Sequence, residues 1–382
     1  FPDCRPARSW PGFTKPNETI FDEQADGQAW RGRRGDVMKI AVYLPNWVGD
    51  AVMATPALAA IRSHLSEAEV VGVLRPYVAD VLDGTGLVDR VIEWDPRGGD
   101  HDRSGWRLAR RLRHEQFDVA VLLPNSLRSA WMAWLSGARR RVGFSRNGRR
   151  VLLTDPVRPG SRNTPHPVLD EYLRLVEPLG CGSTDHRMHL SVSSHDEAGW
   201  RAIRAKRSDV LGQRPYICFN PGGAFGAAKH WPSQLFGELA RMIVSETELS
   251  VVVVCGPSEC AEADAIVAAA GVPRVVSLAD EAPSLGLTKA VIRHATALVT
   301  TDSGPRHFAA PFQVPVVTMF GPTHIAWSET HFDKATHVQL DLDCGPCQQR
   351  TCPLGHHRCM TELTPSRVYR ELMSLMKQAQ AA

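Results

Sequence analysis

Short apolar runs alternate along the chain with segments whose apolar residues recur at helical spacing. In the first half, runs of strand length occur at 39–44, 69–74, 90–93, 119–123 and 141–143, with helical patterns between them, for example at 51–64 and 108–114. The alternation starts again at 216–220 and continues at 249–255, 297–301 and 314–320. Because such alternation is typical of a parallel sheet covered by helices on both faces, the pattern predicts an α/β fold in two halves.

The same pattern predicts the domain boundaries. Residues 1–37 mix Pro, Gly and charged residues without periodicity, and we interpret them as a disordered or upstream-translated leader. We expect a first domain over 38–187 and a second over 188–364, joined near the turn-rich stretch 180–195. The last segment, 365–382, has the pattern of an amphipathic helix, which we expect to pack back on the first domain.

Composition narrows the class of protein. A chain of 382 residues with 43% hydrophobic content can bury two ordinary cores. The near balance of 44 Lys and Arg against 41 Asp and Glu does not indicate nucleic-acid binding. No apolar run approaches the roughly 18 residues that cross a bilayer, and nine cysteines, an odd number, argue against a disulfide framework. We therefore expect a cytoplasmic protein without a transmembrane segment.

Arginine is dense at 107–113 and at 139–150. Such runs are usually solvated surface. The alternative is an anion-binding rim for a phosphorylated or carboxylated acceptor near a membrane surface. Both interpretations stay open at this point.

The loop after the first predicted strand carries the first candidate catalytic group. Asn46 and Gly49 interrupt the apolar run, and Asp50 stands where the next helix is predicted to begin. In open α/β sheets, ligands bind beyond the carboxyl ends of the strands, so this loop is expected to face a cleft. The alternative is that Asp50 only caps the helix, since Asp is a favoured N-cap residue.

Two further loops follow strands of the second half. Gly222 and Gly223 allow backbone amides to approach an anion closely, and Lys229 adds a positive charge beside them. Glu259, beyond the next strand, is a candidate partner for ribose hydroxyls or, alternatively, a first-turn helix charge. Together these residues predict a site for a phosphorylated ligand.

A third loop begins at Asp302, directly after the strand 297–301. Ser303 and Gly304 are expected at a free helix N-terminus, where unpaired amides and the dipole favour a diphosphate. Because a carboxylate is unsuited to phosphate, we expect Asp302 to accept bonds from sugar hydroxyls or from the backbone. His307 is expected to contact the ligand or make a structural hydrogen bond rather than to act in catalysis.

The tail holds a cluster of soft ligands, with His356 and His357 inside it. The cysteines are Cys344, Cys347, Cys352 and Cys359. They fit a structural zinc site or, alternatively, reduced cysteines that pack a loop.

Five segments in order resemble one known family. They are LPNWVGDAVMATPAL (44–58), NPGGAFGAAKHWP (220–232), TDSGPRHFAA (301–310), VPVVTMFGPT (314–323) and CGPCQQRTCPLGHHRCM (344–360). The chain resembles the ADP-heptose:lipopolysaccharide heptosyltransferases of glycosyltransferase family 9 from about residue 38 to the last helix. The second enzyme of that pathway is the nearer match.

The resemblance implies a GT-B fold, in which two Rossmann-like domains face each other across a cleft. It implies that the first domain takes the acceptor and the second the ADP-sugar. By matching motif positions, Asp50 is the general base, Lys229 contacts the phosphate and Asp302 contacts the sugar. Glu259 is the nearest match to the ribose-binding glutamate. Ser303 and Gly304 fall on the phosphate-binding turn.

The implied reaction is inverting transfer of L-glycero-D-manno-heptose to a heptosyl-Kdo2-lipid A acceptor of the lipopolysaccharide inner core, at the inner membrane surface. The alternatives are a family member that uses another nucleotide sugar and a noncatalytic nucleotide-sugar-binding module. No Asp-x-Asp motif lies near the candidate loops, so we expect no required cofactor and a dispensable divalent metal. Closure about a hinge near 180–195 is expected to assemble the site.

Overall fold

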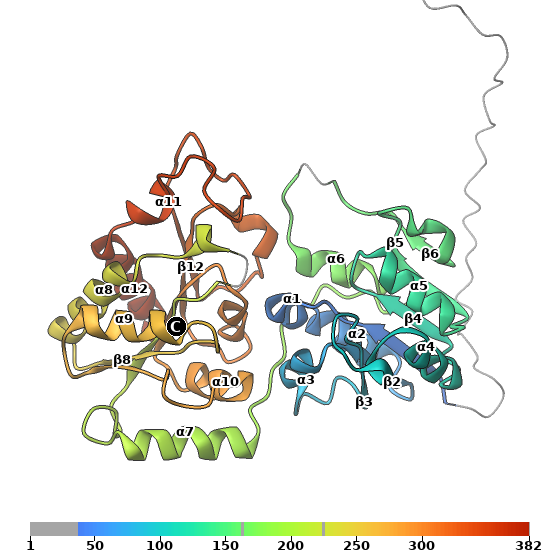
Figure 1. The fold of residues 1–382 in the computed structure, drawn as a ribbon, viewed down its shortest axis with the longest axis horizontal. Coiled ribbons are helices and arrows are strands. Elements are labelled where there is room, and N and C mark those ends of the chain that lie inside the picture. The colour runs from blue at the N-terminus through green and yellow to red at the C-terminus, as the bar shows by residue number, and fades with distance from the viewer. Residues whose placement is uncertain (1–36, 162–163, 224–225, 382) are drawn as a thin grey trace, which may run out of the picture. The chain divides into compact units, whose positions relative to one another are not determined.

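Two parallel six-stranded sheets organise the described part of the computed structural model, residues 37–161, 164–223 and 226–381 (Figure 1). The expected leader lies outside these residues except for Val37. The first sheet has the order β3-β2-β1-β4-β5-β6. Its strands are β1 (Lys39–Tyr43), β2 (Glu69–Leu74), β3 (Arg90–Glu93), β4 (Val119–Leu122), β5 (Arg140–Phe144) and β6 (Asp155–Val157).

The second sheet repeats this topology. Its order is β12-β11-β10-β7-β8-β9, which read from the other edge is again third, second, first, fourth, fifth, sixth. Its strands are β7 (Tyr216–Asn220), β8 (Ser250–Val253), β9 (Val275–Ser277), β10 (Ala297–Thr301), β11 (Val316–Phe320) and β12 (Ala335–Gln339). All pairings between neighbouring strands are parallel. The predicted α/β class with two Rossmann-like halves is confirmed.

Helices connect the strands in each half. Those of the first half are α1 (Val48–Met53), α2 (Thr55–His64), α3 (Pro76–Leu82), α4 (Gly105–His114), α5 (Leu127–Leu135) and α6 (Val168–Arg174), with the 3-10 turns η1 (His101–Arg103), η2 (Arg149–Leu152) and η3 (Glu177–Leu179). Those of the second half are α7 (Ser194–Lys206), α8 (Ser233–Glu246), α9 (Cys260–Ala270), α10 (Leu285–Arg293), α11 (Arg358–Thr361) and α12 (Pro365–Ala381), with η4 (Ala227–Lys229), η5 (Gly304–Phe308) and η6 (Ile325–Ser328). None of the described helices is long and apolar enough to cross a membrane.

The strands are buried on both faces, as the continuous apolar runs predict. In β1, Ile40 and Val42 enter one apolar cluster while Ala41 and Tyr43 enter another. The first of these clusters also contains Tyr216 from β7. The inner apolar layers of the two halves are therefore continuous, and residues 37–382 form one unit by their contacts.

The single helix predicted at 51–64 is two helices. They meet at Ala54, where the Thr55 hydroxyl donates to the Val52 carbonyl at 2.6 Å and Pro56 lacks an amide hydrogen. The Thr55 hydroxyl also accepts from the His189 amide at 2.9 Å. Through this hydrogen bond, the break between α1 and α2 contacts the segment between η3 and α7, where the domain boundary was expected.

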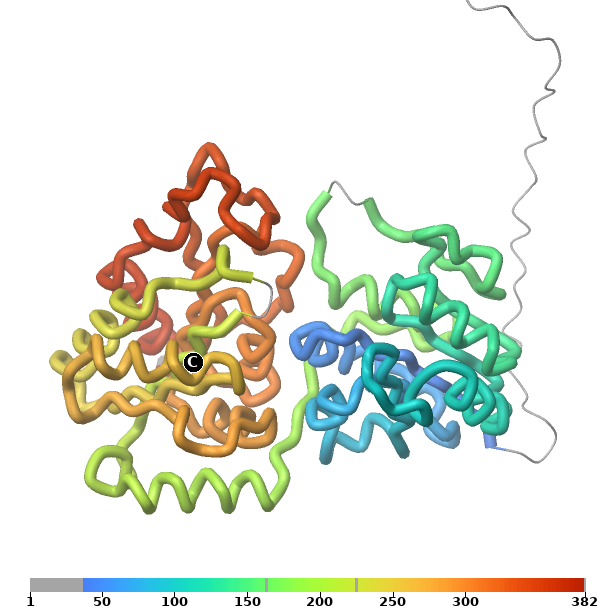
Figure 2. Tube along the Cα trace, viewed as in Figure 1, coloured from blue at the N-terminus to red at the C-terminus, as the bar shows by residue number. Residues whose placement is uncertain are grey.

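The last helix does not pack as predicted. Val368, Leu372, Leu375 and Met376 of α12 join the apolar cluster of the second sheet, and the helix contacts α8, β10, β11 and β12. The trace in Figure 2 shows α12 beside these elements. The expectation that it packs back on the first domain is wrong, because its apolar stripe matches the surface of the second sheet.

Candidate active site

Lys229 and Asp302 form a buried ion pair in the second half. Lys229 lies in η4 and Asp302 directly follows β10, so two loops at the carboxyl edge of the sheet bring them together. The Lys229 ammonium donates to Asp302 Oδ2 at 2.5 Å and to the Asp302 carbonyl at 2.9 Å. Their side chains are only 11% and 10% exposed, so the pair is largely shielded from water.

The carboxylate of Asp302 has further partners that the sequence reasoning missed. Thr323, after β11, donates to Oδ2 at 2.6 Å, and Ser328 donates to Oδ1 at 3.3 Å. The buried guanidinium of Arg306 lies 3.7 Å from Oδ1. Thr323 and Arg306 stand in two of the motifs quoted above, and their places just beyond strand ends were the available signal.

These neighbours decide the charge of Asp302. Burial alone would raise the pKa of its carboxyl, but Lys229, Arg306 and the hydrogen bond from Thr323 hold that pKa at about 2. The carboxylate is therefore ionised throughout the physiological range. Its charge is offset by Lys229 and Arg306, while Glu329 acts on Arg306 and Asp50 acts on Lys229.

Asp50 lies in the first turn of α1, and the helix is capped at Trp47 without a side-chain bond. The alternative that Asp50 is the N-cap is therefore wrong. Burial raises the pKa of Asp50 to about 6, opposed by Lys229 and reinforced by Asp302. The pKa of Asp50 in the first half therefore depends on the charges of Lys229 and Asp302 in the second half.

Two glycines allow the halves to approach at this point. A side chain added at Gly49 would meet the His307 ring at 2.8 Å and the Gly304 Cα at 3.2 Å. His307 is buried, and burial together with Arg306 lowers its pKa well below the usual value, so the ring is neutral. A neutral His307 therefore packs against the loop that carries Asp50.

Asn46 is turned to a different partner. Its side-chain oxygen accepts from Arg75 Nε at 3.2 Å, and its carbonyl accepts from the Tyr77 hydroxyl at 2.6 Å. The residue is exposed. The structure brings Asn46 to the same loop as Asp50 but does not gather it with Lys229 and Asp302.

The predicted cradle at Ser303 and Gly304 needs correction. The expected helix is the five-residue 3-10 turn η5, and the Ser303 amide donates to the Thr301 carbonyl at 2.8 Å. The Ser303 hydroxyl accepts from the Asn220 amide group at 2.6 Å. The backbone amide of Ser303 is therefore already bonded to Thr301, and the prediction of an unpaired amide is wrong for Ser303.

The loop after β7 packs on the residue proposed to bind ribose. A side chain added at Gly222 would lie 2.2 Å from a carboxylate oxygen of Glu259, so the glutamate side chain would have to move. Glu259 accepts from the Gly256 amide at 2.8 Å and precedes α9. The Thr301 hydroxyl donates to the Gly222 carbonyl at 2.7 Å, and Gly223 is buried beside Lys229. Glu259 and the glycine loop are therefore adjacent, while ribose binding stays a prediction.

Not all of the dense arginines are surface charges. Arg149 is fully buried and donates to the carbonyl oxygens of Phe144 and Pro124 and to the side-chain oxygen of Asn125. Both interpretations of the arginine run are wrong for this residue, because its guanidinium supports the loop after β4. The arginines of α4 are exposed and fit a solvated or an anion-binding surface.

The zinc prediction for the tail remains untested. The Cys352 sulfur accepts from the His357 amide at 3.4 Å. Burial raises the pKa of Cys359, with a further effect from the other three cysteines. Within the described residues, the grouping of three metal-ligand atoms inside 4.8 Å of one another is found elsewhere and does not include these sulfurs.

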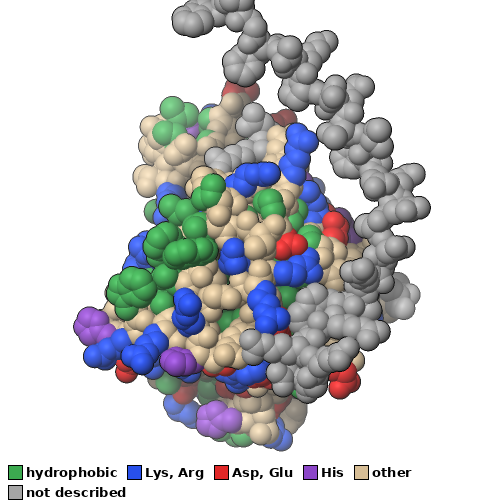
Figure 3. Space-filling view, turned by 90° about the vertical axis from the view of Figure 1, so that its right-hand side faces the viewer, with side chains coloured by type: hydrophobic (Ala, Val, Ile, Leu, Met, Phe, Trp, Pro, Cys, Tyr) green, Lys and Arg blue, Asp and Glu red, His purple; other side chains and the backbone are tan. Residues whose placement is uncertain are grey.

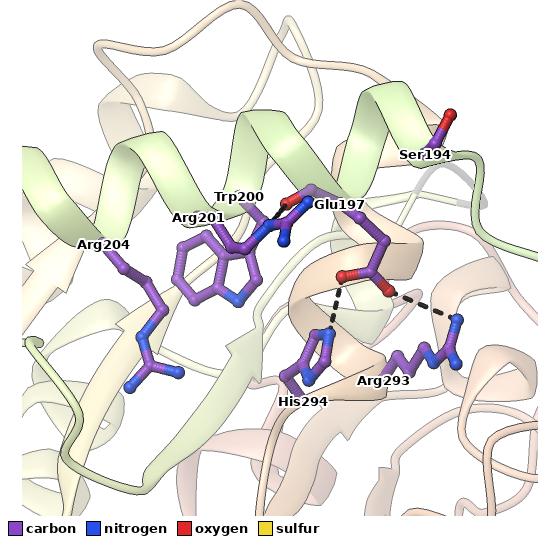
Figure 4. A pocket seen from close by; sticks show the side chains of 7 residues that line it. All are labelled: Ser194, Glu197, Trp200, Arg201, Arg204, Arg293 and His294. Carbon is purple, nitrogen blue, oxygen red and sulfur yellow. Dashed lines mark hydrogen bonds and ion pairs between the residues drawn. The ribbon is translucent and has the colours of Figure 1, made fainter.

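A separate open pocket of about 530 Å³ lies between α7 and α10 (Figure 4). Glu197 is bonded there to His294 at 2.8 Å and to Arg293 at 3.2 Å, beside Trp200 and Arg204. The pocket contains none of the predicted site residues, so its size does not make it the catalytic site.

Two sheets of identical strand order, with an acid from one half facing an ion pair from the other, have the architecture of a GT-B glycosyltransferase. A model of "Glycosyltransferase family 9 (heptosyltransferase)" matches residues 105–358, and the chain belongs to this family. It is therefore a glycosyltransferase. The family resemblance found in the sequence is confirmed.

Individual relatives span nearly the whole chain. Lipopolysaccharide heptosyltransferase 2 of Escherichia coli (strain K12) is 29% identical over 90% of this chain and 100% of the relative. Lipooligosaccharide heptosyltransferase 2 of Campylobacter jejuni is 28% identical over 89% of this chain and 99% of the relative. The solved structure of E. coli ADP-heptose lps heptosyltransferase II superposes with a TM-score of 0.74 at 26% identity, covering 90% and 100% of the two chains.

Proposed function

We propose that this enzyme transfers L-glycero-D-manno-heptose from ADP-heptose to the inner core of lipopolysaccharide, on a heptosyl-Kdo2-lipid A acceptor, with inversion at the anomeric carbon. The family and the names of the relatives support the choice of sugar and acceptor. One observation carries the mechanism. Gly49, next to Asp50 in α1, packs against Gly304 and His307 of the segment that begins at Asp302, which brings Asp50 toward the Lys229–Asp302 pair.

Asp50 is the general base in this proposal. Its carboxylate accepts the proton of the acceptor hydroxyl as that oxygen bonds to the anomeric carbon. The bond from that carbon to the diphosphate breaks, and its electron pair leaves with ADP. A pKa of about 6 suits the task, because the group is mostly ionised near neutral pH yet basic enough to take a proton.

Lys229 stabilises the charge that develops on the leaving diphosphate. Because Arg306 as well as Lys229 faces Asp302, the charge of this carboxylate is shared between two cations and does not cancel that of Lys229 alone. Such fixed charge in a water-poor site is worth more than in bulk solvent. We therefore expect a chelator such as EDTA to leave turnover unchanged; loss of activity restored by Mg²⁺ would contradict this expectation.

Asp302 has two roles in the proposal. It holds Lys229 in place, and it offers its remaining acceptor capacity to a sugar hydroxyl. An ionised carboxyl has about four acceptor sites. Lys229 and Thr323 donate to Oδ2, Ser328 donates to Oδ1 and Arg306 lies 3.7 Å from Oδ1, so a sugar hydroxyl would share Oδ1 with these two groups.

We further propose that the face formed by α4, α5 and η2 rests on an anionic bilayer, where the lipid acceptor lies. These elements pack beside one another and contain no Asp or Glu. Exposed apolar side chains on them are Trp106, Leu127, Trp131, Trp134 and Val151. Exposed arginines on them are Arg107, Arg110, Arg111, Arg113, Arg128 and Arg150.

This composition matches an interfacial surface. On the side of the molecule shown in Figure 3, hydrophobic side chains lie beside Lys and Arg side chains. Aromatic side chains favour the headgroup region, and cations favour anionic lipids. Co-sedimentation with phosphatidylglycerol vesicles should fall for Trp131→Ala/Trp134→Ala and not for His195→Ala; equal binding of all three chains would remove this face from the proposal.

The reaction itself is tested with a panel of ADP- and UDP-sugars and with lipopolysaccharide cores that carry no heptose or one heptose, with products read by mass spectrometry. We expect a gain of one heptose, from ADP-heptose, on the one-heptose core. Transfer from a UDP-sugar instead would favour the alternative family member. No transfer from any donor, with ADP still bound, would favour the noncatalytic module.

A further inference from the structure

We propose that Asp170, His186 and His331 form a binding site for a divalent transition-metal ion that links the two halves of the enzyme. Asp170 belongs to α6 of the first half, His186 to the segment between η3 and α7, and His331 to the loop between η6 and β12 of the second half. None of the three has a place in the proposed transfer chemistry, so ion binding is independent of the proposed function, and only the effect on turnover rests on it.

The three side chains converge on a small volume. Asp170 Oδ1 lies 3.1 Å from His186 Nε2 and 3.5 Å from His331 Nε2. One ligand atom from each residue lies within 4.8 Å of both others. Small movements of exposed side chains would bring the three atoms to the roughly 2.0–2.2 Å at which nitrogen and oxygen bind zinc.

The chemistry of the set favours a cation. The two imidazole rings lie with centroids 4.3 Å apart and planes at 35°, and they share a single carboxylate oxygen. Two imidazoles and a carboxylate are a ligand set suited to Zn²⁺ or Ni²⁺.

The surroundings leave room to complete the coordination. The side chains of Asp170, His186 and His331 are 36%, 33% and 44% exposed, so water can occupy the open positions of a bound ion. The loop that carries His331 is held by Glu329, whose carboxylate accepts from the amides of His331 at 2.9 Å and Thr330 at 2.7 Å. His331, the ligand from the second half, therefore lies on a turn that two hydrogen bonds to Glu329 stabilise.

The position of the site between the two halves means that a bound ion would affect their movement. Because α6 and η6 are in contact and each half contributes a ligand, an ion bound here would oppose separation of the halves. Release of ADP and exchange of acceptor require the facing loops to open if closure assembles the active site. An ion at this position would therefore slow turnover without touching the reacting groups.

Binding is tested by titrating the full chain, without a histidine tag, with Ni²⁺ in a calorimeter. The parent carries Cys344→Ser, Cys347→Ser, Cys352→Ser and Cys359→Ser, so that the thiols of the tail do not compete. We expect one ion per chain and a loss of affinity of at least about tenfold in His331→Ala and in His186→Ala, since even outer partners of a metal site reach that range. His195→Ala, an exposed histidine on α7, is the matched control and should bind as the parent does. Circular dichroism checks that each variant is folded.

Turnover in the presence of Ni²⁺ tests whether the ion links the two halves. Ni²⁺ should slow turnover of the parent and leave His331→Ala unaffected. Unchanged affinity in His331→Ala, or an equal loss in His195→Ala, would overturn the site. Equal slowing of parent and His331→Ala, with affinity lost in the variant, would overturn the link between the halves.

Discussion

The two halves have the same strand order but different polar groups at the point where that order reverses. In the first half, Asp50 lies on a short helix after β1, and the buried Arg149 donates to backbone carbonyls. In the second half, the corresponding loops hold Lys229 and Asp302 with their bonded partners. Topology thus provides two equivalent crevices, and the residues just beyond the strands decide the chemistry of each.

The two aspartates make the same contrast. Asp302 is buried and Asp50 is partly exposed, yet burial raises the pKa of Asp50 to about 6, while the cations around Asp302 overcome burial and hold its pKa at about 2. Two carboxyl groups whose pKa values are pushed apart can serve as a proton acceptor and a permanent anion. The difference arises from bonded partners and not from depth alone.

Removing the acid of the first half should have the largest effect. Asp50→Asn keeps the shape but cannot accept a proton, so we expect kcat to fall by about 10²–10⁴ with ADP affinity nearly unchanged. Steady-state kinetics and calorimetry measure the two quantities. Because the charge of Asp50 is disfavoured by burial, the variant should be no less stable than the parent; near-normal turnover would exclude Asp50 as the base.

Removing the cation of the second half should come next. Lys229→Met retains the apolar stem, and we expect a loss of about 10²–10³ in kcat, the range seen when one electrostatic donor is removed from an active site. In contrast to Asp50→Asn, ADP affinity should also fall. Calorimetry that shows unchanged ADP affinity would count against contact with the diphosphate.

The contact between the halves is probed by Gly49→Ala. The new methyl group would meet the His307 ring at 2.8 Å, so the facing loops must shift, and we expect destabilisation of about 1–3 kcal/mol. Gly99→Ala, where no atom lies within 4 Å, is the control. Urea unfolding measures both, and an equal stability of the two variants would contradict the tight packing.

The smallest effect is expected from pH. Asp50 must be ionised to act, and its pKa in the folded protein is about 6, so kcat/KM should be level above that pH and fall about tenfold for each pH unit below it. Asp302 stays ionised over this range, because its pKa is about 2. A profile that breaks near pH 4 instead would mean that Asp50 is not shielded in the working enzyme.

Much of this arrangement could be predicted from the sequence, because apolar runs set strands and parallel strands place their following loops at one edge. The positions of Asp50, Lys229 and Asp302 follow from that rule. The bonded state of the Ser303 amide and the packing side of α12 depend on tertiary contacts, which a local pattern does not contain. Arg149 was misassigned for the same reason, since an arginine that supports backbone has no sequence signature of its own.

The hydroxyl of Thr55 links α1, which carries Asp50, to the crossover segment between η3 and α7. It closes the turn behind α1 by donating to Val52 and, with its oxygen, receives the His189 amide from the crossover segment. Any rearrangement that carries the crossover away must break this bond and leave a buried oxygen one partner short. Thr55 therefore joins the end of α1, the helix that carries Asp50, to the segment between η3 and α7.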